Sequence, residues 1–203
     1  SAQQTAEESV VVLKEHLDGW LAEKQRVVDA AAVFVAVDKG GDASVLAFLT
    51  ALHRENPGFS SLYFGSAGNK MINASGWTPP EGFDLRTRPW YVKASSEQGP
   101  VITEAFVNAS GDDIVITVAR AVNSPDGRLL GVVAGDVSIQ KITAVIREKR
   151  TGANGFSFLV DGNSRMLAHP RHPFEINRGT PAVTDEYLDL LNAGQRNGIV
   201  RAT

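Results

Sequence analysis

The chain has 203 residues, of which 43% are hydrophobic and 21% charged, and its formal net charge is -3. These values are typical of a folded protein and exclude an intrinsically disordered chain. The balanced charge gives no basis for nucleic-acid binding. The absence of cysteine excludes disulfides, thiolate catalysis and metal sites that use cysteine.

The first element predicted along the chain is one long amphipathic helix. Apolar residues recur every three or four positions from Val10 to Val35, and no proline interrupts residues 5–38. Lys39-Gly-Gly41 should end it. At 1.5 Å per residue such a helix is roughly 50 Å long, so we expect it to pack along more than one module or to lead out of this segment.

A second helix is predicted from Asp42, as its N-cap, to Asn56, where Asn-Pro-Gly stops it. Residues 60–66 then have the composition of a strand. Gly68-Asn69 should turn the chain into a short second strand over residues 71–75.

Three further strands are predicted as an antiparallel meander. They cover residues 101–109, 114–122 and 129–137, and the turns Gly111-Asp-Asp113 and Ser124-Pro-Asp-Gly127 connect them. A helix over residues 139–150, capped by Ser138, should close this unit.

A weak internal repeat follows. The strands predicted at 156–160 and 165–168, with a turn between them, repeat the pattern of the first strand pair. A helix at 185–191 and a strand at 198–201 complete the predictions. Because a second sheet of similar size needs more strands, we expect this module to be incomplete in the 203 residues.

The segment Phe83-Asp-Leu-Arg-Thr-Arg-Pro-Trp-Tyr91 has the most unusual composition. Pro89 suits the first position of a helix, and an arginine side chain can donate two parallel hydrogen bonds to a carboxylate. Together with the helix start, this favours a site for a small anion. The alternative is a surface arginine pair with Trp90 and Tyr91 as core anchors.

This run, with the sheet pattern behind it, resembles the Cache superfamily, and specifically the membrane-distal module of double Cache receptors. The resemblance also covers the long first helix, Ile102-Thr-Glu-Ala-Phe106, Leu130-Gly-Val-Val-Ala-Gly-Asp136 and Gly155-Phe-Ser-Phe-Leu-Val-Asp-Gly162. It implies an α+β fold with two PAS-like antiparallel modules. The expected divisions are a stalk helix (1–41), a distal module with the pocket (42–150) and an incomplete proximal module (151–203).

The resemblance also implies a set of ligand-binding residues. In amino-acid-binding members, the pattern assigns Arg88 and Trp90, with Tyr91, to the ligand carboxylate, and Asp136 to its ammonium. The predicted set further includes Phe83, Phe106, Asn108, Tyr63 and Ser75.

Three positions depart from that pattern. Phe83 and Phe106 stand where tyrosines are expected, and Asn108 stands where a second acid is expected. A site that lacks a charge partner binds an ammonium less well. These departures therefore favour, as the ligand, a small carboxylate or an amino-acid relative with a modified amino end over an ordinary α-amino acid. Asp112 and Asp113 could replace the acid, although a role as turn residues is the simpler interpretation.

Other kinds of site are not favoured. His169 and His172 have no third metal ligand at a defined spacing, and His16 and His53 have no evident partner. No phosphate loop, nucleophile elbow or zinc-protease motif occurs. We therefore predict no enzyme, metal or cofactor; a hydrolase would have to use Asp84 or Asp136 as a base.

The sequence thus predicts the periplasmic ligand-sensing domain of a bacterial inner-membrane receptor. The ligand is expected to be an amino acid or a small organic acid, and the output could be a kinase, a cyclase or a chemotaxis domain. The apolar face of the first helix also allows a homodimer. A ligand-free dimerisation ectodomain is therefore the alternative function.

Overall fold

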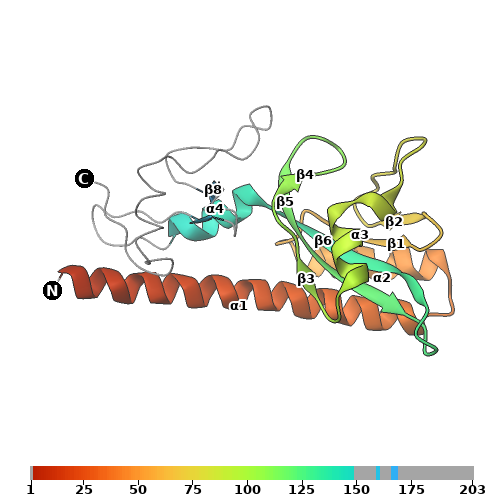
Figure 1. Ribbon diagram of the computed structural model, residues 1–203, viewed down its shortest axis with the longest axis horizontal. Helices are drawn as coiled ribbons and strands as arrows, with labels where there is room; N and C mark the ends of the chain where they lie inside the picture. The colour runs from red at the N-terminus through yellow and green to blue at the C-terminus, as the bar shows by residue number, and fades with distance from the viewer. Residues whose placement is uncertain (1, 149–158, 161–165, 169–203) are drawn as a thin grey trace. The chain divides into compact units, whose positions relative to one another are not determined.

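The computed structural model describes residues 2–148, 159–160 and 166–168 of the chain (Figure 1). The chain divides into two compact units, one formed by Ala22–Ser138 and the other by Ser1–Leu21 with Ile139–Thr203. Within the described residues, no helix combines the length and the apolar character needed to cross a bilayer.

Two helices precede the sheet. The predicted long helix is confirmed as α1 (Ala2–Val37), which ends just before Lys39-Gly-Gly41. The second helix, α2 (Asp42–Glu55), is also confirmed, but its predicted cap is wrong. Gly41 is the N-cap, with a φ of 73°, and it makes no side-chain cap bond. Asp42 lies inside the first turn, where it forms an ion pair with Lys70 instead.

Six strands form one antiparallel sheet in the unit Ala22–Ser138. They are β1 (Ser61–Ser66), β2 (Met71–Asn73), β3 (Val101–Ile102), β4 (Phe106–Val107), β5 (Ile114–Asn123) and β6 (Leu129–Ser138). The spatial order is β2-β1-β6-β5-β3, and β4 also pairs with β5. If β3 and β4 are taken as one interrupted strand, this is the PAS-like order, and the predicted α+β class is confirmed.

The strand predicted over residues 101–109 is therefore two strands. Ile102 pairs with Val118, but Phe106 pairs with Val115, so three residues lie opposite two on β5. Thr103 holds this bulge, because its backbone N–H donates to Thr117 O at 3.0 Å and its hydroxyl accepts from Thr117 N at 2.9 Å. The extra residue reverses the alternation and turns Phe106 to the face that carries Val115.

The two faces of the sheet pack against different elements. On one face, α2 packs against β1 and β2, and α1 is tied to β5 by the Asp29–Arg120 ion pair at 2.6 Å. On the other lie the short helix η1 (Leu85–Thr87) and α3 (Pro89–Ser96), which packs against β5 and β6 (Figure 1). Pro89 occupies the first turn of α3, as predicted.

The second unit is described in part. It contains α4 (Ile139–Glu148), which begins directly after Ser138, and the antiparallel pair β7 (Leu159–Val160) and β8 (Met166–Ala168). The pair agrees with the predicted second strand–turn–strand opening. The remainder of the helix predicted to Arg150, the elements predicted at 185–191 and 198–201, and His169 and His172 lie outside the described residues.

Candidate ligand-binding site

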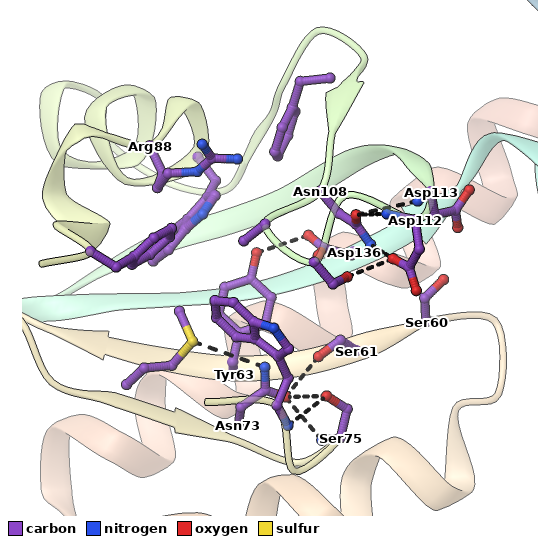
Figure 2. Close-up of a pocket in the computed structure, with 17 residues that line it drawn as sticks. Ser60, Ser61, Tyr63, Asn73, Ser75, Arg88, Asn108, Asp112, Asp113 and Asp136 are labelled. Carbon is purple, nitrogen blue, oxygen red and sulfur yellow. Dashed lines mark hydrogen bonds between the residues drawn. The ribbon is translucent and has the colours of Figure 1, made fainter. Parts of the chain in front are cut away.

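A cavity of about 350 Å³ lies in the unit Ala22–Ser138, and its lining brings most of the predicted site residues together (Figure 2). All of them except Tyr91 line it: Tyr63, Ser75, Phe83, Arg88, Trp90, Phe106, Asn108 and Asp136. That these side chains contact a ligand stays a prediction.

Strand register explains why residues far apart in sequence meet here. Ser61 pairs with Asp136, which in turn pairs with Thr117, and Tyr63 pairs with both Asn73 and Ala134. Paired residues of an antiparallel sheet share a face, and every second residue of a strand returns to it. The bulge between β3 and β4 adds Phe106 to the same face. One face of the sheet is therefore the floor of the cavity.

Arg88 is the basic side chain of the described lining. The neighbouring Arg86 does not compete, because its Nε and Nη2 donate to the two carboxylate oxygens of Asp84 at 2.8 and 2.9 Å. This pairing lowers the pKa of Asp84, chiefly through the side-chain hydrogen bond from Arg86. Arg86 is thus paired with Asp84 at the surface. Arg88 carries the positive charge at the cavity.

Two aromatic rings hold Arg88 in place. Its guanidinium carbon lies 5.7 Å from the centre of the Phe83 ring and 5.6 Å from that of Phe106. These distances are within the range of a cation–π interaction. Its Nη2 donates to Val107 O at 3.3 Å, whereas its Nε is buried and makes no hydrogen bond within the described residues. A buried donor with no partner is costly, so Arg88 is ready to donate to an acceptor in the cavity.

Trp90 forms an apolar wall beside Arg88. It is only 3% exposed and meets the Tyr63 ring edge-on, with centroids 5.1 Å apart. Gly65 makes room for it, because an added Cβ would lie 2.7 Å from Trp90 Cη2 and 3.0 Å from Leu85 Cδ1. β1 therefore lacks a side chain at the one point where the indole crosses it.

Tyr91 differs from the prediction. It is 5% exposed, belongs to the apolar cluster between α3 and the sheet, and is not part of the cavity lining. The reason is helical geometry, since successive residues of a helix project about 100° apart and Trp90 already takes the direction of the cavity. Burial raises the pKa of Tyr91. Its described role is to pack edge-on against Trp90 at 5.5 Å.

Asp136 is the acid at the centre of the sheet. Its Oδ1 accepts hydrogen bonds from the Tyr63 hydroxyl at 2.8 Å and from the Thr117 hydroxyl at 2.6 Å (Figure 2). No hydrogen bond reaches its Oδ2 within the described residues. Burial raises the pKa of Asp136 to about 6, although the bonds from Thr117 and Tyr63 act in the opposite direction. Burial, followed by the charge of Asp136, also raises the pKa of Tyr63. Asp136 therefore presents one free oxygen to the cavity.

The turn between β4 and β5 forms the wall next to Asp136. Asn108 Oδ1 accepts from the backbone N–H groups of Gly111, Asp112 and Asp113 at 3.0, 3.2 and 3.3 Å. Its Nδ2 donates to Asp112 Oδ1 at 2.8 Å. Hydrogen bonds from Ser110 and Asn108 lower the pKa of Asp112. Asn108 thus uses both ends of its amide to shape the turn, and both aspartates of that turn line the cavity.

The sequence matches the family model of the Cache domain, in its double Cache form, over residues 1–198.

This chain belongs to the Cache domain family.

Relatives of this Cache domain are chemotaxis receptors. It is 26% identical over 195 residues to the methyl-accepting chemotaxis protein PscA of Pseudomonas syringae pv. tomato. The matched region covers 93% of this chain but only 31% of PscA. The chain thus spans about a third of the length of that curated relative.

Two solved ligand-binding domains are similar to this Cache domain. The domain of the Pseudomonas fluorescens chemoreceptor CtaA in complex with L-alanine has a TM-score of 0.72 and 28% identity, covering 81% of this chain and 70% of that one. The domain of the Pseudomonas aeruginosa PAO1 amino-acid chemoreceptor PctC in complex with GABA has a TM-score of 0.70 and 26% identity. That match covers 87% of this chain and 82% of the PctC domain.

The cavity of this Cache domain also has a lining that sequence reasoning missed: Ser60, Ser61, Met71, Asn73, Trp77, Ala109 and Ser110. Asn73 Oδ1 accepts from Ser61 Oγ at 2.8 Å and from both the N–H and the hydroxyl of Ser75 at 2.9 Å. Because a backbone N–H can only donate, the Asn73 oxygen faces Ser75. The alternation of residues along β1 and β2 could have indicated which of them share a face with Tyr63, but only once the pairing register of the two strands was known.

No three acidic or histidine side chains of the described Cache domain are grouped so that they could hold a metal ion. His53 is on α2, with its Nε2 3.2 Å from Phe59 O, and is not part of the cavity lining.

Proposed function

We propose that this Cache domain is the periplasmic ligand-sensing part of a bacterial transmembrane receptor. In this proposal the ligand is a small amino-acid-like molecule that binds in the cavity of the unit Ala22–Ser138. The chemotaxis relatives and the ligand-bound domains of CtaA and PctC support the general role. We further propose the division into a stalk helix (1–41), a distal module (42–150) and a proximal module (151–203).

One observation supports the proposal: the same cavity is lined by Arg88 and by Asp136, and within the described part of the chain neither the buried Nε of Arg88 nor the Oδ2 of Asp136 has a hydrogen-bond partner. An arginine fork suits a carboxylate, and an ionised carboxylate suits an ammonium group. A zwitterion supplies both partners, whereas a plain carboxylate leaves the buried Asp136 unmatched.

The aromatic lining supports the same ligand class. Trp77 and Phe83 meet edge-on with ring centres 5.6 Å apart, and Trp90 also lines the cavity. Small-molecule sites usually combine such apolar walls with a few polar groups that fix orientation. In our proposal Arg88 and Trp90 bind the carboxylate end and Asp136 binds the ammonium end.

A thermal-shift and calorimetric screen of the purified chain tests this function. The compounds are amino acids, matched carboxylic acids that lack the amine, and matched amines that lack the carboxylate. We expect an amino acid to raise the melting temperature most, because only it satisfies both charges. Binding that survives both Arg88→Ala and Asp136→Asn would contradict the proposed site.

The competing function is a ligand-free dimerisation ectodomain, and one observation favours it. Val33 and Val37 on α1 are 60% and 68% exposed, one turn apart. Exposed apolar pairs on a helix can form a pairing face. Sedimentation that depends on protein concentration and is lost in Val33→Ser/Val37→Ser, with no thermal shift from any compound, would favour this second function.

Signalling would follow from a shift in conformational populations. A ligand changes the output only to the extent that it binds one arrangement of the receptor more tightly than another. The chemotaxis relatives support a chemotaxis output over a kinase or a cyclase.

A further inference from the structure

The charges around the cavity are unequal. Among the described lining residues the basic side chain is Arg88, whereas the acidic ones are Asp112, Asp113 and Asp136. In Figure 2 these acids lie together with Asn108, away from Arg88. A neutral zwitterion that pairs with Arg88 and Asp136 leaves the charge of the turn uncompensated.

The two aspartates of the turn differ in the hydrogen bonds of their carboxylates. Asp112 accepts from Ser110 Oγ at 2.5 Å and from Asn108 Nδ2 at 2.8 Å. The carboxylate of Asp113, by contrast, has no hydrogen bond or ion pair within the described residues, although its backbone N–H is fixed by Asn108. The backbone of Asp113 is therefore held in position, and among the described residues its carboxylate has no hydrogen-bond or ion-pair partner.

Asp113 is close enough to Asp136 to influence it. The charge of Asp113 raises the pKa of Asp136, although less than burial does. The acids of the cavity still do not form a group that could hold one metal ion. Asp136 belongs to β6 and Asp113 to the turn between β4 and β5, so two cationic groups of one ligand can each pair with a different carboxylate.

We infer that the ligand is a dibasic amino acid, with its carboxylate on Arg88, its α-ammonium on Asp136 and a second cationic group on Asp113. The inference rests on the proposed function and narrows its ligand class. Asn108 holds the backbone of Asp113 in position for this contact. The rings of Trp77, Phe83 and Trp90 would cover the methylene chain between the charges.

Calorimetry with matched ligand pairs tests the inference. L-Lysine is compared with L-norleucine, and L-arginine with L-citrulline, since the members of each pair have similar shape but differ by one positive charge. We expect the basic member to bind at least about tenfold more tightly, because a charge-assisted hydrogen bond contributes about that factor.

Variants then assign the preference to Asp113. In Asp113→Asn the ratio within each pair should fall to near one through weaker binding of the basic member, and Asp113→Glu should retain it. Asp126→Asn is the matched control, because Asp126 is an exposed turn aspartate outside the lining. Thermal melting of each variant, without ligand, verifies folding.

The outcomes separate this inference from the proposed function. If neutral and basic members bind equally and Arg88→Ala abolishes both, the proposed function stands and the dibasic ligand is wrong. If the basic members bind more tightly but Asp113→Asn leaves the ratio unchanged, the role of Asp113 is wrong. If no amino acid binds at all, the proposed function itself fails.

Discussion

The two ends of the cavity are built on different principles. At one end a single charge, Arg88, is held between Phe83 and Phe106, and its buried Nε has no hydrogen bond to any described residue. At the other, Asp136 and the turn of Asn108 and Asp113 form hydrogen-bonded networks that leave particular oxygens free. Carboxylate recognition should therefore depend on one side chain, whereas cation recognition should be shared among several residues that each contribute a part of the affinity.

The largest effect should come from removing the single charge. Arg88→Ala should weaken amino-acid binding by at least about 100-fold, since truncating one partner of a desolvated charge pair is strongly destabilising. Calorimetry measures the dissociation constant. Arg86→Ala is the matched control and should change it little, because Arg86 is paired with Asp84 at the surface. Equal losses of affinity in the two variants would contradict the conclusion that Arg88 alone carries the charge that binds the carboxylate.

At the acid end, Asp136→Asn should weaken binding of an amino acid by about 10- to 100-fold. The same change should stabilise the ligand-free domain. Burial raises the pKa of Asp136 to about 6, so the ionised carboxylate is disfavoured in the folded state at neutral pH. We expect the free energy of unfolding at pH 7 to rise by about 1–3 kcal/mol, as measured in urea. A less stable variant would show that Asp136 supports the fold.

The raised pKa also predicts a pH dependence. A folded pKa above the ordinary 3.8 means that the folded domain keeps a proton that the unfolded chain has lost, so stability falls as the pH rises from about 4 to 6. Ligand affinity should move in the opposite direction, because an ammonium pairs with the ionised form. We expect about fivefold tighter binding at pH 6 than at pH 5 and about tenfold tighter binding at pH 7, levelling off above that pH. Asp136→Asn should abolish this slope.

The smallest effect should come from loosening the turn. Asn108→Ala removes three bonds to backbone N–H groups but no charge. Ordering the freed turn on binding should weaken affinity for a basic amino acid by about threefold to tenfold. Asn123→Ala, at an exposed strand end, is the control. A loss as large as that of Asp136→Asn would mean that Asn108 contacts the ligand itself.

The two ends of the cavity differ in how far the local sequence determines their geometry. Arg88, Pro89 and Trp90 are adjacent in the chain, and a proline at a helix start fixes their geometry locally. Asp136 and Asp113 come together through strand pairing and through the turn that Asn108 stabilises by accepting from the Asp113 backbone N–H. Tyr91 is not part of the cavity lining, although it is adjacent to Trp90, because adjacent residues of a helix project in different directions.

Elements were predicted well where the pattern is local. The long helix and the hairpin at Ser124–Gly127 follow from periodicity and turn chemistry alone. The break between β3 and β4 does not, since it depends on Thr103 bonding to a strand that lies 14 residues further along. The cap at Gly41 was missed because Asp42 is an equally suitable N-cap by residue type, and only backbone geometry separates the two.

The bulge beside Thr103 has a consequence for how such pockets diversify. Phe106 faces the cavity because β3 and β4 together have one residue more than the strand they pair with. If all these residues paired regularly, without the bulge, Phe106 would shift to lie opposite Ile114 and face outward, and Val107 would face inward, while the other strands kept their partners. A shift of register, with no substitution at the floor of the cavity, could thus replace an aromatic contact to Arg88 by an aliphatic one. Changes that remove this bulge while keeping its residues would then alter the range of ligands that the domain binds.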